Sequence, residues 1–530
     1  MDIIEKEKKK RTILYGLLVT VLVLIGVTYA YYRITKTQTN SNVIGTRTCL
    51  DTTLTEETSE IVLSDAFPIS DEDGLKQSPF TFTLTNNCDS YVKVTIALVS
   101  EYRTSTNTAY LKDNYVKSNL STKGTNDGSS VILSTLSLGE VDTNTQGYVL
   151  KTTGLKNKEA KSFDLRLWLD SETTNEQGLN KTWKGKIVVS VVAAEYVPTF
   201  AETILANNEV KAPITTPGAA ISTADEAEFA STEDDYGTSY YFRGAVTNNY
   251  VEFANKCWRI VRVGGDGSVK LILHNDNTAG VANPCDSANN SASAAFARYS
   301  ETTYTSAFNT NYNDNAYVGF KYGTVGASDY ATTHANTNNS TILTNLEAWY
   351  NNNLKTYESV IDDNVWCNDK TNVTDETYDP WNYTPNGLGY ANNVTFYGAT
   401  QRLVSSTSGS AGGTGLSLKC NGKLSKITSK IGLITADELA FAGYAAGTTA
   451  GTGNTTTYLQ ENATDTYWWS LSPSNFYGNS ARVWIVGGSS GVFGHRSVGN
   501  TSAVRPSIFL KSTTNVTGNG TSSSPFIISM

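Results

Sequence analysis

Histidine, methionine and charged side chains are scarce in this 530-residue chain. It contains three histidines, two methionines and 17% charged residues, whereas an average soluble domain is about 25% charged. The histidines, His274, His334 and His495, are far apart and show no spacing typical of a metal site. The formal net charge of −9 argues against binding to nucleic acid or anionic lipid through charge. We therefore expect no metal site, no cofactor and no nucleic-acid partner.

The six cysteines include no Cys-x-x-Cys pair, which argues against zinc binding and thioredoxin-type chemistry. Their number fits an exported protein with disulfides. The sequence does not fix their connectivity, and unpaired cysteines that pack as small apolar residues are the alternative. The candidate pairs are Cys49 with Cys88, Cys257 with Cys285, and Cys367 with Cys420.

A basic tail and a long apolar run begin the chain. Residues 1–11 are rich in lysine, and residues 12–32 are almost entirely apolar. The run is long enough to cross a bilayer as a helix, with the basic tail on the cytoplasmic side. The alternative is a cleaved signal peptide with a small-x-small site at 28–30. Under both hypotheses the rest of the chain is exported, either as the extracellular part of a single-pass membrane protein or as a secreted protein.

Residues 42–196 show strand patterns without helical periodicity. Phe80–Leu84 and Phe163–Leu167 alternate apolar and polar side chains, and Lys186–Val192 is typical of a more buried strand. These runs predict an antiparallel β-sandwich. The acidic stretch Asp71–Gly74 lacks the spaced carboxylates of a calcium loop and predicts a solvated turn.

The leader and the first strand resemble those of a known secreted family. The apolar leader ending in Thr28–Tyr32, the polar stretch after it and the run Pro79–Asn87 are similar to the TasA/camelysin proteins of Gram-positive bacteria. The resemblance implies a jelly-roll-like sandwich at the cell surface and, for some members, assembly into matrix fibres. Such assembly adds a free segment as a strand to a neighbouring sheet. Self-assembly through the sandwich is therefore the structural alternative.

The composition changes in residues 197–235, which are rich in alanine, threonine and glutamate. This segment predicts a linker, with a short helix over Thr199–Asn208. In the residues that follow, Asp266-Gly267 between alternating runs predicts a hairpin. Ser340 predicts a helix start, and Thr435–Glu438 is a capping box. Strands and helices in this order predict a mixed α+β domain over residues 236–530.

Several motifs in this domain occur in an order that resembles a family of bacterial surface domains of unknown function. The motifs are Cys257–Arg262, Ile431–Glu438, Trp469–Pro473 and Val504–Pro506. That family is similar in pattern to the C-type-lectin fold of the formylglycine-generating enzymes. The resemblance implies a C-type-lectin-like α+β domain whose last strands and loops display a binding face.

The sequence does not predict catalysis. A formylglycine-generating enzyme needs thiols late in the domain, and no cysteine follows Cys420. The triplets of calcium-dependent sugar-binding lectins are missing as well. His495 with Arg496 suggests acid–base chemistry, but no nucleophile is identified nearby, which favours an exposed polar contact. The run Gly409–Gly415 lacks the ending of a phosphate-binding loop and predicts a flexible loop.

Aromatic and arginine side chains, which are enriched at binding hot spots, gather in the last strands and loops. Phe493, His495 and Arg496 lie among glycines, which favours exposure. Trp484 fits core and surface equally, because strand alternation leaves its face undetermined. The alternative for Arg482 and Arg505 is a structural role, bonding carbonyls or packing on the tryptophan pair, and for Arg505 this role is the prediction. The predicted ligand-binding residues, in the loop regions 474–479 and 487–501 and the strand between them, are Phe476, Tyr477, Arg482, Trp484, Phe493, His495 and Arg496.

Together these features predict a mainly β protein. It would consist of an N-terminal transmembrane helix, an antiparallel β-sandwich and a C-type-lectin-like domain. The predicted function is adhesion at the bacterial cell surface, by recognition of an extracellular protein or glycan ligand. A matrix or fibre subunit is the alternative.

Overall fold

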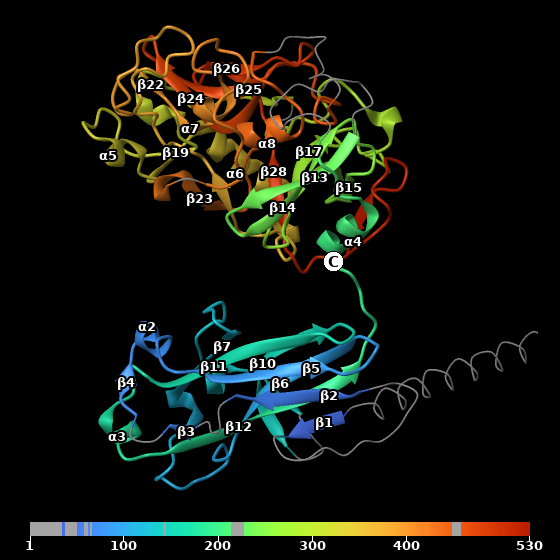
Figure 1. The fold of residues 1–530 in the computed structure, drawn as a ribbon, viewed down its shortest axis with the longest axis vertical. Helices are drawn as coiled ribbons and strands as arrows, with labels where there is room; N and C mark the ends of the chain where they lie inside the picture. Colours follow the sequence, from blue (N-terminus) through green and yellow to red (C-terminus); the bar gives the residue numbers. More distant parts are fainter. Residues whose placement is uncertain are drawn as a thin grey trace, which may run out of the picture. The chain divides into compact units, whose positions relative to one another are not determined.

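Strands dominate both units of the protein (Figure 1). Its computed structural model describes residues 34–37, 50–57, 62–63, 66–140, 145–213, 227–300, 302–420, 422–447 and 457–529. The chain divides into two compact units, Met1–Val197 and Pro198–Met530. The mainly β class with several antiparallel sheets is confirmed. No helix within the described ranges is long and apolar enough to span a membrane, and the predicted tail 1–11 and anchor or signal segment 12–32 lie outside them.

The first unit has two sheets that share one apolar core, as in a β-sandwich. Phe82 pairs with Phe163 in one sheet, with ring centroids 5.6 Å apart, while Ile96 and Ile187 reach the same core from the other. Each large side chain enclosed in this way contributes about 1.5–3 kcal/mol. One sheet has the order β1 (Ile34–Thr37), β12 (Trp183–Ala193), β6 (Val92–Ser100), β10 (Gln146–Leu155), β9 (Leu138–Glu140), with β3 (Val62–Leu63) beside β12. The other has the order β2 (Thr52–Glu56), β5 (Phe80–Asn86), β11 (Ala160–Asp170), β7 (Val116–Thr122), β8 (Val131–Ile132), with β4 (Pro68–Ile69) beside β11.

Short helices lie in the connections of the first unit. They are α2 (Asp71–Gly74) and α3 (Asn175–Gly178). The acidic stretch predicted as a turn is therefore a single helical turn, which begins because the Ser70 side chain accepts a hydrogen bond from the Asp73 amide.

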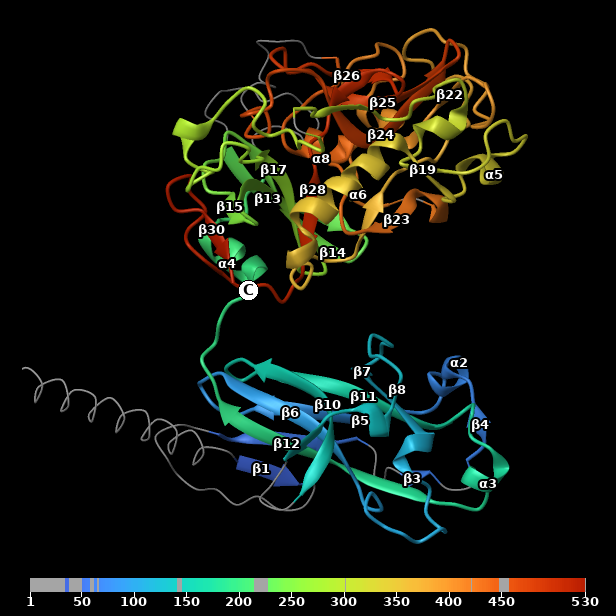
Figure 2. The ribbon, with the colours of Figure 1, turned by 180° about the vertical axis from the view of Figure 1, so that it is seen from behind.

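The second unit contains two larger sheets, seen from both sides in Figures 1 and 2. The larger comprises β13 (Ala227–Asp234), β14 (Gly237–Gly244), β16 (Lys256–Val263), β15 (Tyr250–Phe253), β30 (Phe526–Ile528) and β29 (Val516–Thr517), with β17 (Val269–Asn275) between β16 and β28 (Ser507–Leu510). The other comprises β18 (Thr305–Ala307), β27 (Thr501–Ala503), β24 (Trp468–Tyr477), β25 (Ser480–Val486) and β26 (Phe493–Ser497), with β22 (Thr395–Phe396) beside β24. Small pairs are β19 (Lys321–Tyr322) with β20 (Asn338–Asn339), and β21 (Asn364–Cys367) with β23 (Lys426–Ser429). The helices are α4 (Phe200–Asn207), α5 (Tyr330–His334), α6 (Thr341–Asn353), α7 (Gly398–Leu403) and α8 (Ala436–Phe441).

Local sequence signals fix several of these elements. The Ser340 side chain caps α6, and the capping box at Thr435 opens α8, both as predicted. Asp266-Gly267 turns β16 into β17, with Gly267 at φ +80°. The disulfides Cys257–Cys285 and Cys367–Cys420 are confirmed. The third candidate pair includes Cys49, which lies outside the described residues.

The ends of the predicted linker belong to the second unit. Phe200 in α4 is 1% exposed and packs on Phe526, with ring centroids 5.2 Å apart. Thr199 forms a backbone bridge with Asn515, and β13 pairs along its whole length with β14. The second unit therefore includes residues that composition alone assigned to a linker. They form a short helix with a buried apolar face and a strand that completes a sheet. Residues 214–226 lie outside the described ranges.

Candidate functional site

The hairpin β25–β26 presents one face on which four of the predicted binding residues meet. Trp484 lies opposite His495 across the two strands. Because side chains alternate along a strand, Arg482 shares the face of Trp484, and Phe493 that of His495. The Trp484 ring lies 4.8 Å from the Phe493 ring and 6.4 Å from the His495 ring, measured between centroids. The Trp484 indole N–H donates to Thr400 Oγ1 in α7 at 3.2 Å, so α7 covers part of this face.

A cavity of about 280 Å³ opens beside this face, and we call it the aromatic pocket. Trp381 forms its outer wall, with its ring centroid 4.6 Å from that of His495. Gly409, at φ +64°, allows this approach, since a Cβ there would meet Trp381 Nε1 at 2.6 Å. Its size is near the lower end of ligand pockets, about 300–1,000 Å³, so it suits a single ring. The described lining residues, none of them acidic, are Trp381, Gly409, Ala446, Gly447, Trp484, Val492, Phe493, Gly494 and His495.

Arg482 lies next to the pocket, on the far side of His495. Its Nη1 is 3.5 Å from His495 Nε2 and donates to the Tyr383 hydroxyl at 3.4 Å. Its guanidinium also lies beside the edges of the stacked Tyr383 and Tyr477 rings, 5.9 and 5.7 Å from their centroids. No carboxylate of the described chain forms an ion pair with it. Because arginine carries five N–H donors, two long contacts leave most of its hydrogen-bonding capacity open.

His495 is neutral at physiological pH. Burial lowers its pKa to about 4, and the charge of Arg482 acts in the same direction. Since the guanidinium can only donate, Nε2 of His495 accepts, and the proton of the neutral ring is on Nδ1. Nδ1 is buried and has no hydrogen-bond partner among the residues that the structure describes. A general acid or base works best with a pKa near the working pH, so this imidazole suits binding rather than proton transfer.

Three of the predicted ligand-binding aromatics are core residues, which corrects the expectation of outward-facing side chains. Phe476 and Trp484 are 1% exposed, and Phe493 is fully buried. The glycines around Phe493 indicated a loop, but the residue begins β26 and packs between Trp484 and Tyr444. Trp484 and Phe493 therefore supply the inner wall of the pocket and no free surface.

The other predicted residues are half-buried, and not all of them meet. Tyr477 is linked to the site through Arg482 and Tyr383. Arg496 alternates to the opposite face of β26, where its guanidinium lies 4.8 Å from the centroid of the Tyr467 ring. Arg505, predicted as structural, is buried over the Trp468 ring, and it donates to the carbonyl of Leu273 at 2.8 Å.

Sequence reasoning missed Trp381 and Tyr383, which come from the segment between β21 and β22. The Asp379 side chain accepts hydrogen bonds from the backbone amides of Tyr383 and Thr384, at 2.6 and 2.9 Å, and these bonds shape the turn. A usable signal was present, because Tyr378–Tyr383 holds three aromatics in an otherwise polar stretch. What the sequence does not show is that this turn lies against β25 and β26.

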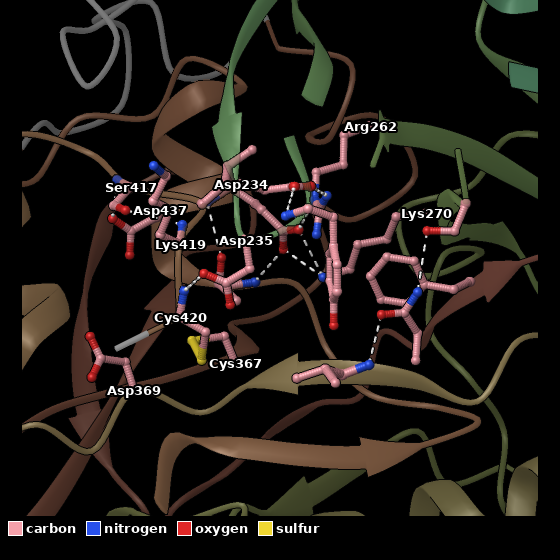
Figure 3. A pocket seen from close by; sticks show the side chains of 18 of the residues that line it. Asp234, Asp235, Arg262, Lys270, Cys367, Asp369, Ser417, Lys419, Cys420 and Asp437 are labelled. Atoms are coloured by element: carbon pink, nitrogen blue, oxygen red, sulfur yellow. Dashed lines mark hydrogen bonds and ion pairs between the residues drawn. A yellow bond between two sulfur atoms is a disulfide. The ribbon is translucent and has the colours of Figure 1, made fainter. Parts of the chain in front are cut away.

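A second cavity, lined by charged side chains, lies between the larger sheet and α8 (Figure 3). Arg262 contacts Asp234 at 3.0 Å and Glu438 at 2.9 Å, and Lys270 lies 2.6 Å from Glu438. Burial raises the pKa of Glu438, but the charges of Lys270 and Arg262 outweigh it and lower that pKa to about 2. The carboxylate is therefore ionised at physiological pH.

A second ion-pair group completes the wall of this cavity. Arg402 donates to Asp369 at 2.6 Å and, through two nitrogens, to Asp437 at 2.8 Å. The disulfide Cys367–Cys420 lies at its edge (Figure 3). The cavity measures about 50 Å³, room for a few waters at about 10–15 Å³ each. Arg262, Lys270 and Arg402 are each paired with carboxylates of its lining, so we interpret it as a structural network and the aromatic pocket as the candidate binding site.

Comparisons with known proteins do not assign a role to the aromatic pocket. The chain matches no protein-family model, no curated protein and no solved structure. In the part of the chain that the structure describes, no three His, Cys, Asp or Glu side chains are grouped so as to hold a metal ion. The site is therefore interpreted from its own geometry.

Proposed function

We propose that the protein is a binding protein of the bacterial cell surface, which recognises an extracellular protein or glycan ligand noncovalently through the aromatic pocket. The observation that carries this proposal is the pocket itself. Trp381 and Trp484 wall a ring-sized cavity, and Arg482 beside it has open N–H donors. Large rings next to an arginine are the residue types that dominate binding hot spots.

Two features support an extracellular location. The disulfides Cys257–Cys285 and Cys367–Cys420 fit an oxidising compartment. The apolar run 12–32 fits a single-pass anchor, or a cleaved signal that would release the protein. In this proposal the first unit is a TasA-like stalk, and the second unit is a C-type-lectin-like domain that carries the pocket.

The chemistry of the pocket supports binding over catalysis. His495 is the only titratable residue of the described lining, and it is held neutral by burial. Among the described residues that line the pocket there is no serine, cysteine or threonine to act as a nucleophile. Rings and a neutral imidazole supply contact area and dipoles, which hold a ligand without changing it.

A glycan array and a pull-down of surface proteins, both with the purified full-length chain, test the proposal. Trp381→Ala removes the outer wall of the pocket and should weaken any ligand found by about tenfold or more. Arg496→Gln, on the opposite face of β26, is the matched control and should bind as the parent does. Ligands that bind both variants equally would show that the pocket is not the site. Regular filaments in electron micrographs of the purified chain would favour the fibre-subunit alternative.

A further inference from the structure

We propose that the aromatic pocket binds a ring that carries an acid group, with the ring between Trp381 and the inner wall and the acid paired with Arg482. This inference rests on the proposed function, because it names the ligand class of the same pocket. The ligand would be either a free small acid with one ring or a larger molecule that ends in a carboxylated ring.

The first argument is that Arg482 lacks the close partners that Arg259, Arg262, Arg402 and Arg505 have in the described chain. Arg259, Arg262 and Arg402 each lie 2.6–3.0 Å from a carboxylate. Arg505 is also bonded at short distance, to a backbone carbonyl at 2.8 Å. Arg482 instead has a hydroxyl at 3.4 Å and a neutral ring nitrogen at 3.5 Å. Its charge is thus not neutralised by the described chain and is available to an anion.

The second argument is the lining of the pocket. None of the described residues that line it is acidic, so a cationic ligand would find ring faces there but no counter-charge. Arg482 would also repel such a ligand. The His495 ring separates Arg482 from the cavity and stays neutral. The local field therefore favours a negative group on the ligand.

The third argument is preorganisation. Arg482 is held at the edge of the stacked rings of Tyr383 and Tyr477. A guanidinium fixed in this way loses less conformational freedom when it pairs with an acid. The cavity of about 280 Å³ admits one ring, and an acid on a short arm of that ring would reach past His495 to the guanidinium.

Three one-ring probes of different charge test this inference on the full-length chain. They are phenylacetate, phenylacetamide and phenethylamine, with dissociation constants measured by ligand-observed NMR titration. We expect phenylacetate to bind at least tenfold more tightly than the amide, and the amine to bind most weakly. The preference for the acid should shrink as the salt concentration rises.

Variants separate this inference from the proposed function. Arg482→Gln should remove the preference for the acid and leave the affinity for the amide unchanged, Arg482→Lys should keep part of the preference, and Arg496→Gln should keep all of it. Equal binding of acid and amide by the parent chain would overturn the acid inference and leave the pocket as a neutral-ring site. If no probe binds, the acid inference is wrong. The proposed function fails with it only if the array and pull-down ligands are also insensitive to Trp381→Ala.

Discussion

The rings of Tyr383 and Tyr477 stack with their centroids 3.7 Å apart and their planes 4° from parallel. Tyr383 comes from the turn that also carries Trp381, and Tyr477 ends β24. The pair therefore joins the outer wall of the aromatic pocket to the sheet below it. Arg482 contacts both rings, so the stack determines where its charge lies.

Replacing Tyr383 by alanine should weaken phenylacetate binding about two- to tenfold, because an aromatic pair contributes about 0.5–1.5 kcal/mol. Without the stack, Arg482 would sample more conformations and pair less well with the acid. Tyr383→Phe keeps the rings, removes only the long hydroxyl contact of 3.4 Å, and should bind nearly as the parent does. NMR titration measures both variants. Unchanged affinity in the alanine variant would contradict the role given to the stack.

Gly409→Ala should displace Trp381 and open the pocket. The added Cβ would lie 2.6 Å from Trp381 Nε1, on a backbone at φ +64°. Gly478→Ala is the matched control, since Gly478 has a similar φ of +60° but no atom within 4 Å of the new Cβ. Both variants carry the strain of a left-handed alanine, about 1–2 kcal/mol. Only Gly409→Ala should also lose ring binding, and titrations together with thermal denaturation curves distinguish the two effects.

Glu438→Gln should destabilise the second unit by about 3–5 kcal/mol, because it leaves Lys270 and Arg262 buried without their shared carboxylate. The control is Glu358→Gln, which removes a solvent-exposed pair with Lys355 and should leave the unfolding midpoint unchanged. Urea denaturation followed by tryptophan fluorescence measures both. A midpoint for Glu438→Gln equal to that of the control would show that the buried network adds nothing to stability.

Acid should destabilise the second unit through its buried histidines. Burial and then the charge of Lys370 lower the pKa of His334 to about 3, burial with Arg259 lowers that of His274 well below its usual value of 6.5, and burial with Arg482 lowers that of His495 to about 4. In the unfolded chain all three bind protons below about pH 6.5, so their contribution to the free energy of unfolding is largest above that pH. It should fall toward pH 4 by up to about 1.4 kcal/mol per pH unit for each histidine.

Urea denaturation at pH 7, 6 and 5 measures this slope. His334→Gln should reduce this pH dependence of the free energy of unfolding by the contribution of one histidine, since glutamine does not titrate. The variant loses the bond in which His334 Nε2 donates to the Gly389 carbonyl at 2.7 Å, so its stability should be lower at every pH. A slope equal to that of the parent would contradict the assignment of a depressed pKa to His334.

Features encoded by neighbouring residues could be predicted from the sequence. The hairpin at Asp266-Gly267 and the helix starts at Ser340 and Thr435 depend on turn and cap geometry within a few residues, and the structure confirms them. The structural role of Arg505 also followed, since an arginine beside an apolar strand needs acceptors wherever it is buried. These signals do not depend on residues that are far away in the sequence.

Features that depend on tertiary contacts could not be predicted in the same way. The neighbouring glycines favoured an exposed Phe493. In the structure Phe493 is buried, because β26 pairs with β25 and the Phe493 ring packs on Tyr444. The contribution of Trp381 depends on a long connection folding back over β25. The composition before β13 predicted the short helix α4, and the structure confirms it. It did not show that α4 belongs to the second unit, where Phe200 packs on Phe526.

The final strands of the chain complete the larger sheet of the second unit. β30 lies parallel to β15, and β28 pairs with β17, while the bond from Arg505 to Leu273 joins residues 232 positions apart. Strands β15 and β17 therefore keep one unpaired edge each until residues 507–528 have been synthesised. Pairing between residues so far apart in the sequence slows folding, and unpaired strand edges favour aggregation, so we expect chaperones that cover these edges to raise the yield of this protein.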